Sequence, residues 1–184
     1  RQMCIRDRAH AVNRVVFDKT GTLTSGSPRI VHQHAVDGDD AQLLQLAGAL
    51  QRGSEHPLAK AVLDACAEQG LTVADIQDSQ SLTGRGIAGH LDGRDLALGN
   101  RRLLDESGLQ PGDLANDAKA WEAEGRTLSW LIERSPQPRV LGLFAFGDSL
   151  KPGAGQAIRQ LAGQNISSHL LTGDNRGSAS AVSY

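Results

Sequence analysis

The chain has 184 residues, of which 39% are hydrophobic and 22% are charged. This composition excludes a disordered tail, a collagen-like repeat and a coiled coil, and the length suffices for one large core or two small ones. The formal net charge is −2 and only 3% of the residues are aromatic. A chain without a basic stripe or stacking aromatics is not expected to bind nucleic acid.

The two cysteines, Cys4 and Cys66, cannot build a disulfide framework, which favours a reducing compartment. No apolar run approaches the roughly 18 residues that span a bilayer. The N-terminal string RQMCIRDR also lacks the pattern of a signal peptide. We therefore expect a soluble segment, and we expect it to be monomeric. The strings Met3–Arg8 and Val182–Tyr184 look like translated sequencing artefacts, and we expect them to be foreign to the natural protein.

The first half of the chain is expected to hold a strand followed by two helices. The short β-branched run at 15–17 predicts a buried strand that ends at Asp18, and the polar segment 19–28 predicts a loop. The aspartates at 39–40 are good N-caps for a helix with a leucine-rich face. Pro57 suits the first turn of a second helix.

The second half is expected to begin with a hairpin, because Asp92-Gly93 separates two apolar runs. A helix is predicted between Pro111 and Gly125, and another that opens at Pro152. The predicted strands of this half lie at 87–91, 94–98, 127–132, 140–146 and 166–171.

The two ends of the chain differ in pattern from its middle. The ends read strand–loop and strand–helix–strand, which indicates a parallel sheet, whereas the middle reads as a compact α+β module. We therefore expect an α/β fold in which one domain, made of residues 1–29 and 139–184, is interrupted by an inserted domain at 30–138.

The sharpest chemical signal is the run DKTGTLT, which begins at Asp18. An aspartate at the C-terminal end of a parallel strand points into the crevice where open α/β sheets bind ligands. A carboxylate there can carry a phosphoryl group as an aspartyl phosphate. Thr20 lies on the same side of an extended chain, and its oxygens suit Mg²⁺ and phosphate. A lone aspartate would be read as a polar turn, but the whole run argues for chemistry.

DKTGTLT resembles the phosphorylation motif of P-type ATPases, within the haloacid-dehalogenase-like superfamily. A second run, TGDN at 172–175, resembles the segment of that family that contacts phosphate. The resemblance implies a Rossmannoid phosphorylation domain, with Mg²⁺ held by Asp18 and Thr20. The catalytic residues that it implies are Asp18 as phosphate acceptor, Lys19, Thr20, Thr172, Gly173 and Asp174.

The identity of the residue at position 20 distinguishes ion pumps of this superfamily from its phosphatases. Phosphatases of this superfamily usually carry a second aspartate there as a general acid and base. Thr20 cannot carry a proton in that way near neutral pH. The aspartyl phosphate should therefore persist, as a pump requires.

The middle of the chain resembles the heavy-metal-transporting subclass through SEHPLA at 54–59. In that subclass the motif histidine, here His56, contacts adenine; the alternative is a histidine that caps the helix or lies on the surface. Gln51 stands where the family often has a glutamate, so no role is carried over to it.

The GRGIAG string at 84–89 does not open a helix, so it is no Rossmann fingerprint. The resemblance implies close approach to a nucleotide, whereas turns and bulges are the alternative reading of the glycines. The implied nucleotide contacts are Glu55, His56, Gly84, Gly86, Ile87, Gly99 and Asn100.

Other residues are assigned no role in catalysis or binding. His32 and His34 lack partners at metal-ligand spacing and are expected at the surface, and Cys66 and the tryptophans at 121 and 130 are expected in the core. Lys151, before Pro152, could orient the nucleotide, support a hinge or remain solvated.

From roughly Ala9 to Ala181, the chain resembles the cytoplasmic ATP-binding and phosphorylation segment of a heavy-metal P-type ATPase, most similar to copper(I) exporters. The alternatives are a zinc or cadmium exporter, a free-standing phosphatase of the superfamily, and an inactive nucleotide-binding module. The resemblance implies ATP and Mg²⁺ as cofactors and transmembrane metal-pathway helices, absent here, as partners. It places the parent in the cell (inner) membrane. Because the family's later lysine and GDGxND motifs are absent, we expect ATP binding with little turnover.

Overall fold

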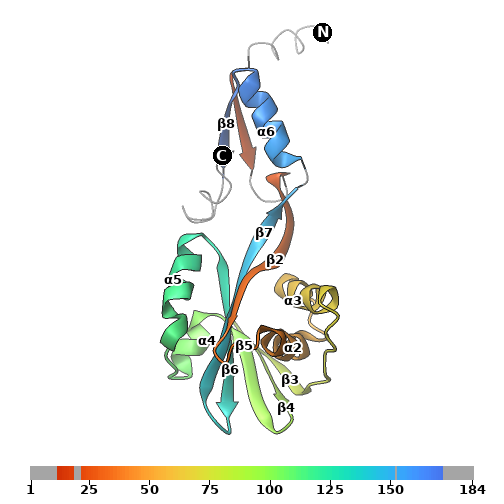
Figure 1. Cartoon of the computed structure of the whole chain (residues 1–184), viewed down its shortest axis with the longest axis vertical. Coiled ribbons are helices and arrows are strands. Elements are labelled where there is room, and N and C mark those ends of the chain that lie inside the picture. The colour runs from red at the N-terminus through yellow and green to blue at the C-terminus, as the bar shows by residue number, and fades with distance from the viewer. Residues whose placement is uncertain (1–11, 19–21, 152, 172–184) are drawn as a thin grey trace. The chain divides into compact units, whose positions relative to one another are not determined.

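The computed structural model describes residues 12–18, 22–151 and 153–171 (Figure 1). The chain divides into two compact units, one of Arg1–Ser27 with Asp148–Tyr184 and one of Pro28–Gly147. The divisions therefore fall at 27/28 and 147/148, whereas the domain limits at 29/30 and 138/139 stay a prediction. Two long strands, β2 (Thr24–Ala35) and β7 (Arg139–Leu150), each contain one division.

The unit formed by the two ends of the chain contains a parallel strand pair. Strand β1 (Arg14–Asp18) pairs in parallel with β8 (Ser167–Leu171), with Asp18 opposite Leu171. Helix α6 (Ala154–Gly163) precedes β8. The parallel pairing and the strand–helix–strand order confirm the α/β prediction for this part of the chain.

The predicted loop at 19–28 is wrong from Thr24 onward, because β2 already begins there. The first residues of β2, TSGSP, have no hydrophobic pattern, and β2 is formed by pairing with β7, which is distant in sequence. β2 is an edge strand of its sheet, so Pro28 removes no N–H that an inner strand would need. The Thr24 hydroxyl donates a hydrogen bond to Asp148 Oδ2 over 3.0 Å.

The unit Pro28–Gly147 is built on a six-stranded sheet in the order β2-β7-β6-β5-β4-β3. The pairings from β3 through β7 are antiparallel. Asp92 and Gly93 both have positive φ, 51° and 76°, as a type I′ turn requires, so the predicted hairpin is confirmed. The remaining strands are β3 (Gln77–Leu82), β4 (Gly86–Leu91), β5 (Arg94–Gly99) and β6 (Thr127–Ser135).

Helices cover both faces of this sheet (Figure 1). On one face lie α2 (Asp40–Gln51) and α3 (Pro57–Glu68), and on the other lie α4 (Arg101–Glu106), the 3₁₀ turn η2 (Gly112–Leu114) and α5 (Ala115–Ala123). Successive side chains of β5 alternate between the two faces of the sheet: Leu96 and Leu98 pack against the α2–α3 side, and Ala97 packs against the α4–α5 side. Both faces are buried, so the strand is buried throughout its second half.

Helices α2 and α3 begin where the sequence predicts. The Asp39 side chain accepts a hydrogen bond from Gln42 N, and Pro57 is the first residue of α3. Cys66 is 1% exposed and Trp130 is 0% exposed, which confirms both as core residues. Within the described part of the chain, no helix has the length and apolar character needed to cross a bilayer.

Candidate functional site

A cavity of about 540 Å³ lies within the unit Pro28–Gly147. Its apolar wall comes from leucines and one isoleucine of both helix and sheet: Leu58, Leu82, Ile87, Leu98 and Leu128. The rest of the lining is polar or glycine: Gln51, Ser54, His56, Ser81, Gly84, Arg85, Gly86, Gly99, Asn100, Thr127 and Ser129. All of the predicted nucleotide contacts except Glu55, which is exposed outside the lining, are brought together here.

His56 caps the N-terminus of α3. Its Nδ1 accepts a hydrogen bond from Leu58 N over 3.2 Å, so that nitrogen carries the lone pair and the neutral ring carries its proton on Nε2. The capping alternative raised by the sequence is therefore what the structure shows. The same bond leaves Nε2–H as a donor for an acceptor atom in the cavity.

Two of the glycines are required by strand packing. Gly86 of β4 lies directly opposite Gly99 of β5. A Cβ on Gly86 would lie 2.0 Å from Leu98 O, and one on Gly99 would lie 2.0 Å from Arg85 O. No side chain fits at either position, so the two backbones themselves form this part of the cavity wall.

Gly84 and Gly89 differ from that pair. Gly84 has φ +68° and open space around its missing Cβ, so its backbone can face a ligand. A Cβ on Gly89 would lie 2.9 Å from Ile76 Cγ1, and Gly89 is not part of the lining. The string at 84–89 thus combines one open turn with tight packing positions.

Asn100 ties the glycine turn to α4. Its Oδ1 accepts from Leu103 N over 3.3 Å as the N-cap, and its Nδ2 donates to Gly84 O over 2.9 Å. Its backbone N donates to Arg85 O over 2.8 Å. Because these bonds occupy much of the amide, Asn100 positions the cavity wall as well as lining it.

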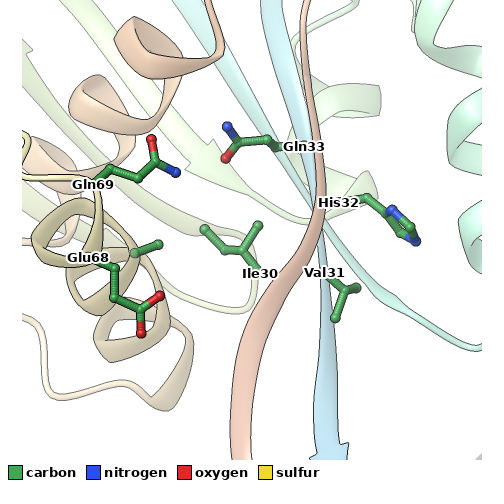
Figure 2. Close-up of a pocket in the computed structure, with 7 residues that line it drawn as sticks. Ile30, Val31, His32, Gln33, Glu68 and Gln69 are labelled. Atoms are coloured by element: carbon green, nitrogen blue, oxygen red, sulfur yellow. The ribbon is translucent and has the colours of Figure 1, made fainter.

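A smaller hollow of about 240 Å³ lies between β2 and α3 (Figure 2). Ile30 and Gln33 point toward the helix, where Glu68 and Gln69 lie, whereas His32 is on the opposite side of the strand. Glu68 pairs with Arg29 over 3.3 Å. The side chains of this hollow do not combine a nucleophile with a base, so it is not a catalytic candidate.

The histidines expected at the surface are 40% exposed at His32 and 49% exposed at His34, and their partners lie on α5 and at its C-cap. His32 stacks on Trp121 with ring centroids 5.1 Å apart and lies 3.4 Å from Glu124 Oε2. His34 pairs with Asp117. Across the described residues there is no group of three or more His, Cys, Asp or Glu side chains that could hold a metal.

Asp18, the first residue of the phosphorylation motif, is the last residue of β1, and only its backbone is described. Since β1 and β8 are parallel and Asp18 is opposite Leu171, both strands end at the same edge. Lys19, Thr20, Thr172, Gly173, Asp174 and the Asp18 side chain lie outside the described residues.

The sequence did not identify the part of the lining that lies on β3 and on the start of β6. Ser81 belongs to a polar strand without hydrophobic alternation. Thr127 and Ser129 reach the cavity because they lie on β6 just before Trp130, and Trp130 pairs with Gly99 of β5. The hairpin signal locates Gly99, but the register of a distant strand against it is set by tertiary packing.

A family model described as haloacid dehalogenase-like hydrolase matches residues 12–183. The chain is 36% identical over 170 residues to a copper-transporting P-type ATPase of Rhizobium leguminosarum bv. viciae, covering 91% of this chain and 20% of that protein. A copper-exporting P-type ATPase of Staphylococcus saprophyticus is 35% identical, with 96% and 21% covered. The chain thus spans about a fifth of the length of these curated relatives.

Solved structures resemble the chain over most of its length. A zinc-transporting PIB-type ATPase in the E2.Pi state matches with a TM-score of 0.83 and 31% identity, covering 93% of this chain and 27% of that one. The catalytic domain of the CPx-ATPase CopB-B matches with a TM-score of 0.64 and 20% identity, covering 94% and 58%, and so shares the fold.

Proposed function

Since the chain belongs to the haloacid dehalogenase-like hydrolase family and is homologous to copper-exporting P-type ATPases, we propose that it is the ATP-binding and phosphorylation segment of a heavy-metal-transporting ATPase. The observation that carries this proposal is the cavity that gathers His56, the glycine turn and Asn100. Its volume and its apolar wall suit a purine base, and its polar rim suits a ribose and phosphates.

The chemistry of the cavity supports adenine binding. Leu58, Ile87 and Leu98 offer an apolar surface for the base, and the His56 Nε2–H donates to a ring nitrogen of adenine. The backbone at Gly84 can approach the nucleotide closely because no side chain intervenes.

Phosphoryl transfer is assigned to Asp18. A carboxylate oxygen of Asp18 attacks the γ-phosphorus of ATP, the bond to the β,γ-bridging oxygen breaks, and ADP leaves with that electron pair. Water later hydrolyses the aspartyl phosphate. Asp18 and Thr20 would hold Mg²⁺, which would supply positive charge to neutralise the phosphates. Thr20 supplies no general acid, so hydrolysis waits for the rest of the transport cycle.

For the transported ion we propose Cu(+), because curated proteins that are 34–36% identical to this chain are named copper-transporting or copper-exporting. Zinc is the second candidate, since the zinc-transporting PIB-type ATPase is 31% identical and matches with a TM-score of 0.83. ATPase stimulation of the longer protein by Cu(+), Zn²⁺ and Cd²⁺, each added alone, distinguishes the two. We further propose that the parent spans the cell (inner) membrane and that this segment faces the cytoplasm.

The test is phosphoenzyme formation by the longer protein that contains this segment. Incubation with ATP labelled on its γ-phosphate should give an acid-stable, hydroxylamine-sensitive label, and Asp18→Asn should abolish it. Undiminished labelling of the Asp18→Asn variant would refute the assignment. Rapid release of phosphate from simple phosphomonoesters would favour a free-standing phosphatase instead.

A further inference from the structure

Arg85 carries the only permanent charge among the described residues that line the cavity. No carboxylate belongs to the described part of the lining, whose other polar groups are hydroxyls, amides and His56. A nucleoside polyphosphate is strongly anionic, so its binding to an otherwise neutral wall depends on where this charge lies.

The backbone of Arg85 is fixed at the edge of the cavity. Its N donates to Leu82 O over 2.9 Å, and its O accepts from Asn100 N over 2.8 Å. The residue stands between Gly84 and Gly86, which have no side chains of their own to cover it. The side chain therefore starts from a rigid point beside the open turn.

Among the described residues, the guanidinium of Arg85 pairs with one carboxylate, that of Glu106, and its Nε is buried without a hydrogen bond of good geometry to that partner. Its Nε lies 2.9 Å from Glu106 Oε2, and the two side chains are 42% and 41% exposed. Glu106 also accepts from Arg102 Nε over 2.7 Å, so one carboxylate serves two arginines. A pair of partly exposed side chains that lacks hydrogen-bond geometry at Nε is weak, and a phosphate offers a guanidinium more charge and two acceptors at once.

We propose that Arg85 is a specificity residue that binds the phosphates of the nucleotide, and that Glu106 is its counter-ion in the nucleotide-free protein. This inference rests on the proposed function of the cavity as an ATP site. Binding replaces the Arg85–Glu106 contact by bidentate hydrogen bonds from the guanidinium to phosphate oxygens, and Glu106 keeps Arg102 as its partner. Arg85 thereby separates nucleotides by their phosphates, while the apolar wall and His56 hold the base.

The test is calorimetric titration of the whole chain with ATP, ADP and adenosine, without added Mg²⁺. In Arg85→Gln the Kd for ATP should rise about tenfold, as expected for loss of a charge-assisted contact, while the Kd for adenosine should change less than about twofold. Arg85→Lys keeps the positive charge but cannot donate two parallel hydrogen bonds as a guanidinium does, so its Kd for ATP should rise about threefold. Glu106→Gln frees Arg85 and should tighten ATP binding about twofold.

Arg102→Gln is the matched control. Arg102 carries the same charge as Arg85 and also pairs with Glu106, but it does not line the cavity. The affinity of this variant for ATP should stay within about twofold of the original. Equal losses for ATP and adenosine in Arg85→Gln, or equal losses in Arg85→Gln and Arg102→Gln, would overturn the inference and leave the ATP site standing. A starting protein that binds neither ATP nor adenosine would overturn the proposed function and this inference together.

Discussion

Replacing Gly99 by alanine should destabilise the unit Pro28–Gly147 through steric overlap alone. The added Cβ would lie 2.0 Å from Arg85 O and 2.8 Å from Leu103 Cδ2, so the β4 and β5 backbones must separate. Overpacking costs about 1–3 kcal/mol, and loss of the nearby bond from Asn100 N to Arg85 O adds about 1 kcal/mol. We expect the free energy of unfolding to fall by about 2–4 kcal/mol.

Urea unfolding followed by tryptophan fluorescence measures this loss directly, because Trp121 and Trp130 both belong to that unit. With a slope of about 2 kcal/mol/M, the midpoint should drop by about 1–2 M. Gly84→Ala is the control, since its Cβ meets nothing within 4 Å and only its φ of +68° opposes alanine, at about 1 kcal/mol. If Gly99→Ala unfolds at the same urea concentration as the unchanged chain, the packing argument is wrong.

Three further predictions concern side chains whose partners are defined. His56→Ala and His56→Asn should both weaken ATP binding about tenfold in calorimetry, but only the alanine variant should lose the roughly 1 kcal/mol of its helix cap; full affinity in His56→Asn would contradict this. Burial raises the pKa of Glu133, but hydrogen bonds from Arg94 and Arg139 lower it more, so the net pKa is below the usual 4.5. The stabilisation by Glu133 is therefore present above pH 4.5 and is lost as the pH falls through the lowered pKa. Glu133→Gln should lower the free energy of unfolding in urea at neutral pH, and in acid the variant and the unchanged chain should become equally stable. A difference in this free energy that stays constant with pH would refute the prediction. Burial raises the pKa of the Cys66 thiol, so peptide mapping after treatment with iodoacetamide should find Cys66 unmodified until urea unfolds the chain, and rapid labelling without urea would contradict its burial.

Local signals in the sequence were enough for the elements whose causes are local. The Asp92-Gly93 turn, the Asp39 cap and Pro57 each act within a few residues, and each lies where it was predicted. Strand β3 and helix α4 were not predicted, because QDSQSL has no apolar alternation and six residues are too few for a helical period. Both exist through tertiary contacts, with β4 for the strand and with β5 and β6 for the helix.

The candidate site divides in the same way. The motif residues His56, Gly84 and Asn100 could be named from the sequence, and their common place around one cavity depends on the hairpin. The reason for Gly86 could not be derived, since only the register opposite Gly99 shows that a Cβ would meet backbone. No sequence pattern pointed to Arg85, because its proposed role depends on its place in the cavity and on its pairing with Glu106, which is distant in sequence.

The central claim is that the cavity of the unit Pro28–Gly147 binds ATP, and amide chemical shifts of the isotopically labelled whole chain test it most directly. On titration with ATP, the account predicts saturable shifts at His56, Gly84, Gly86 and Asn100, which line the cavity. Val31, in the smaller hollow on β2, should remain unchanged and serves as the internal control. Shifts that avoid His56 and both glycine segments, or that centre on Val31, would contradict the account.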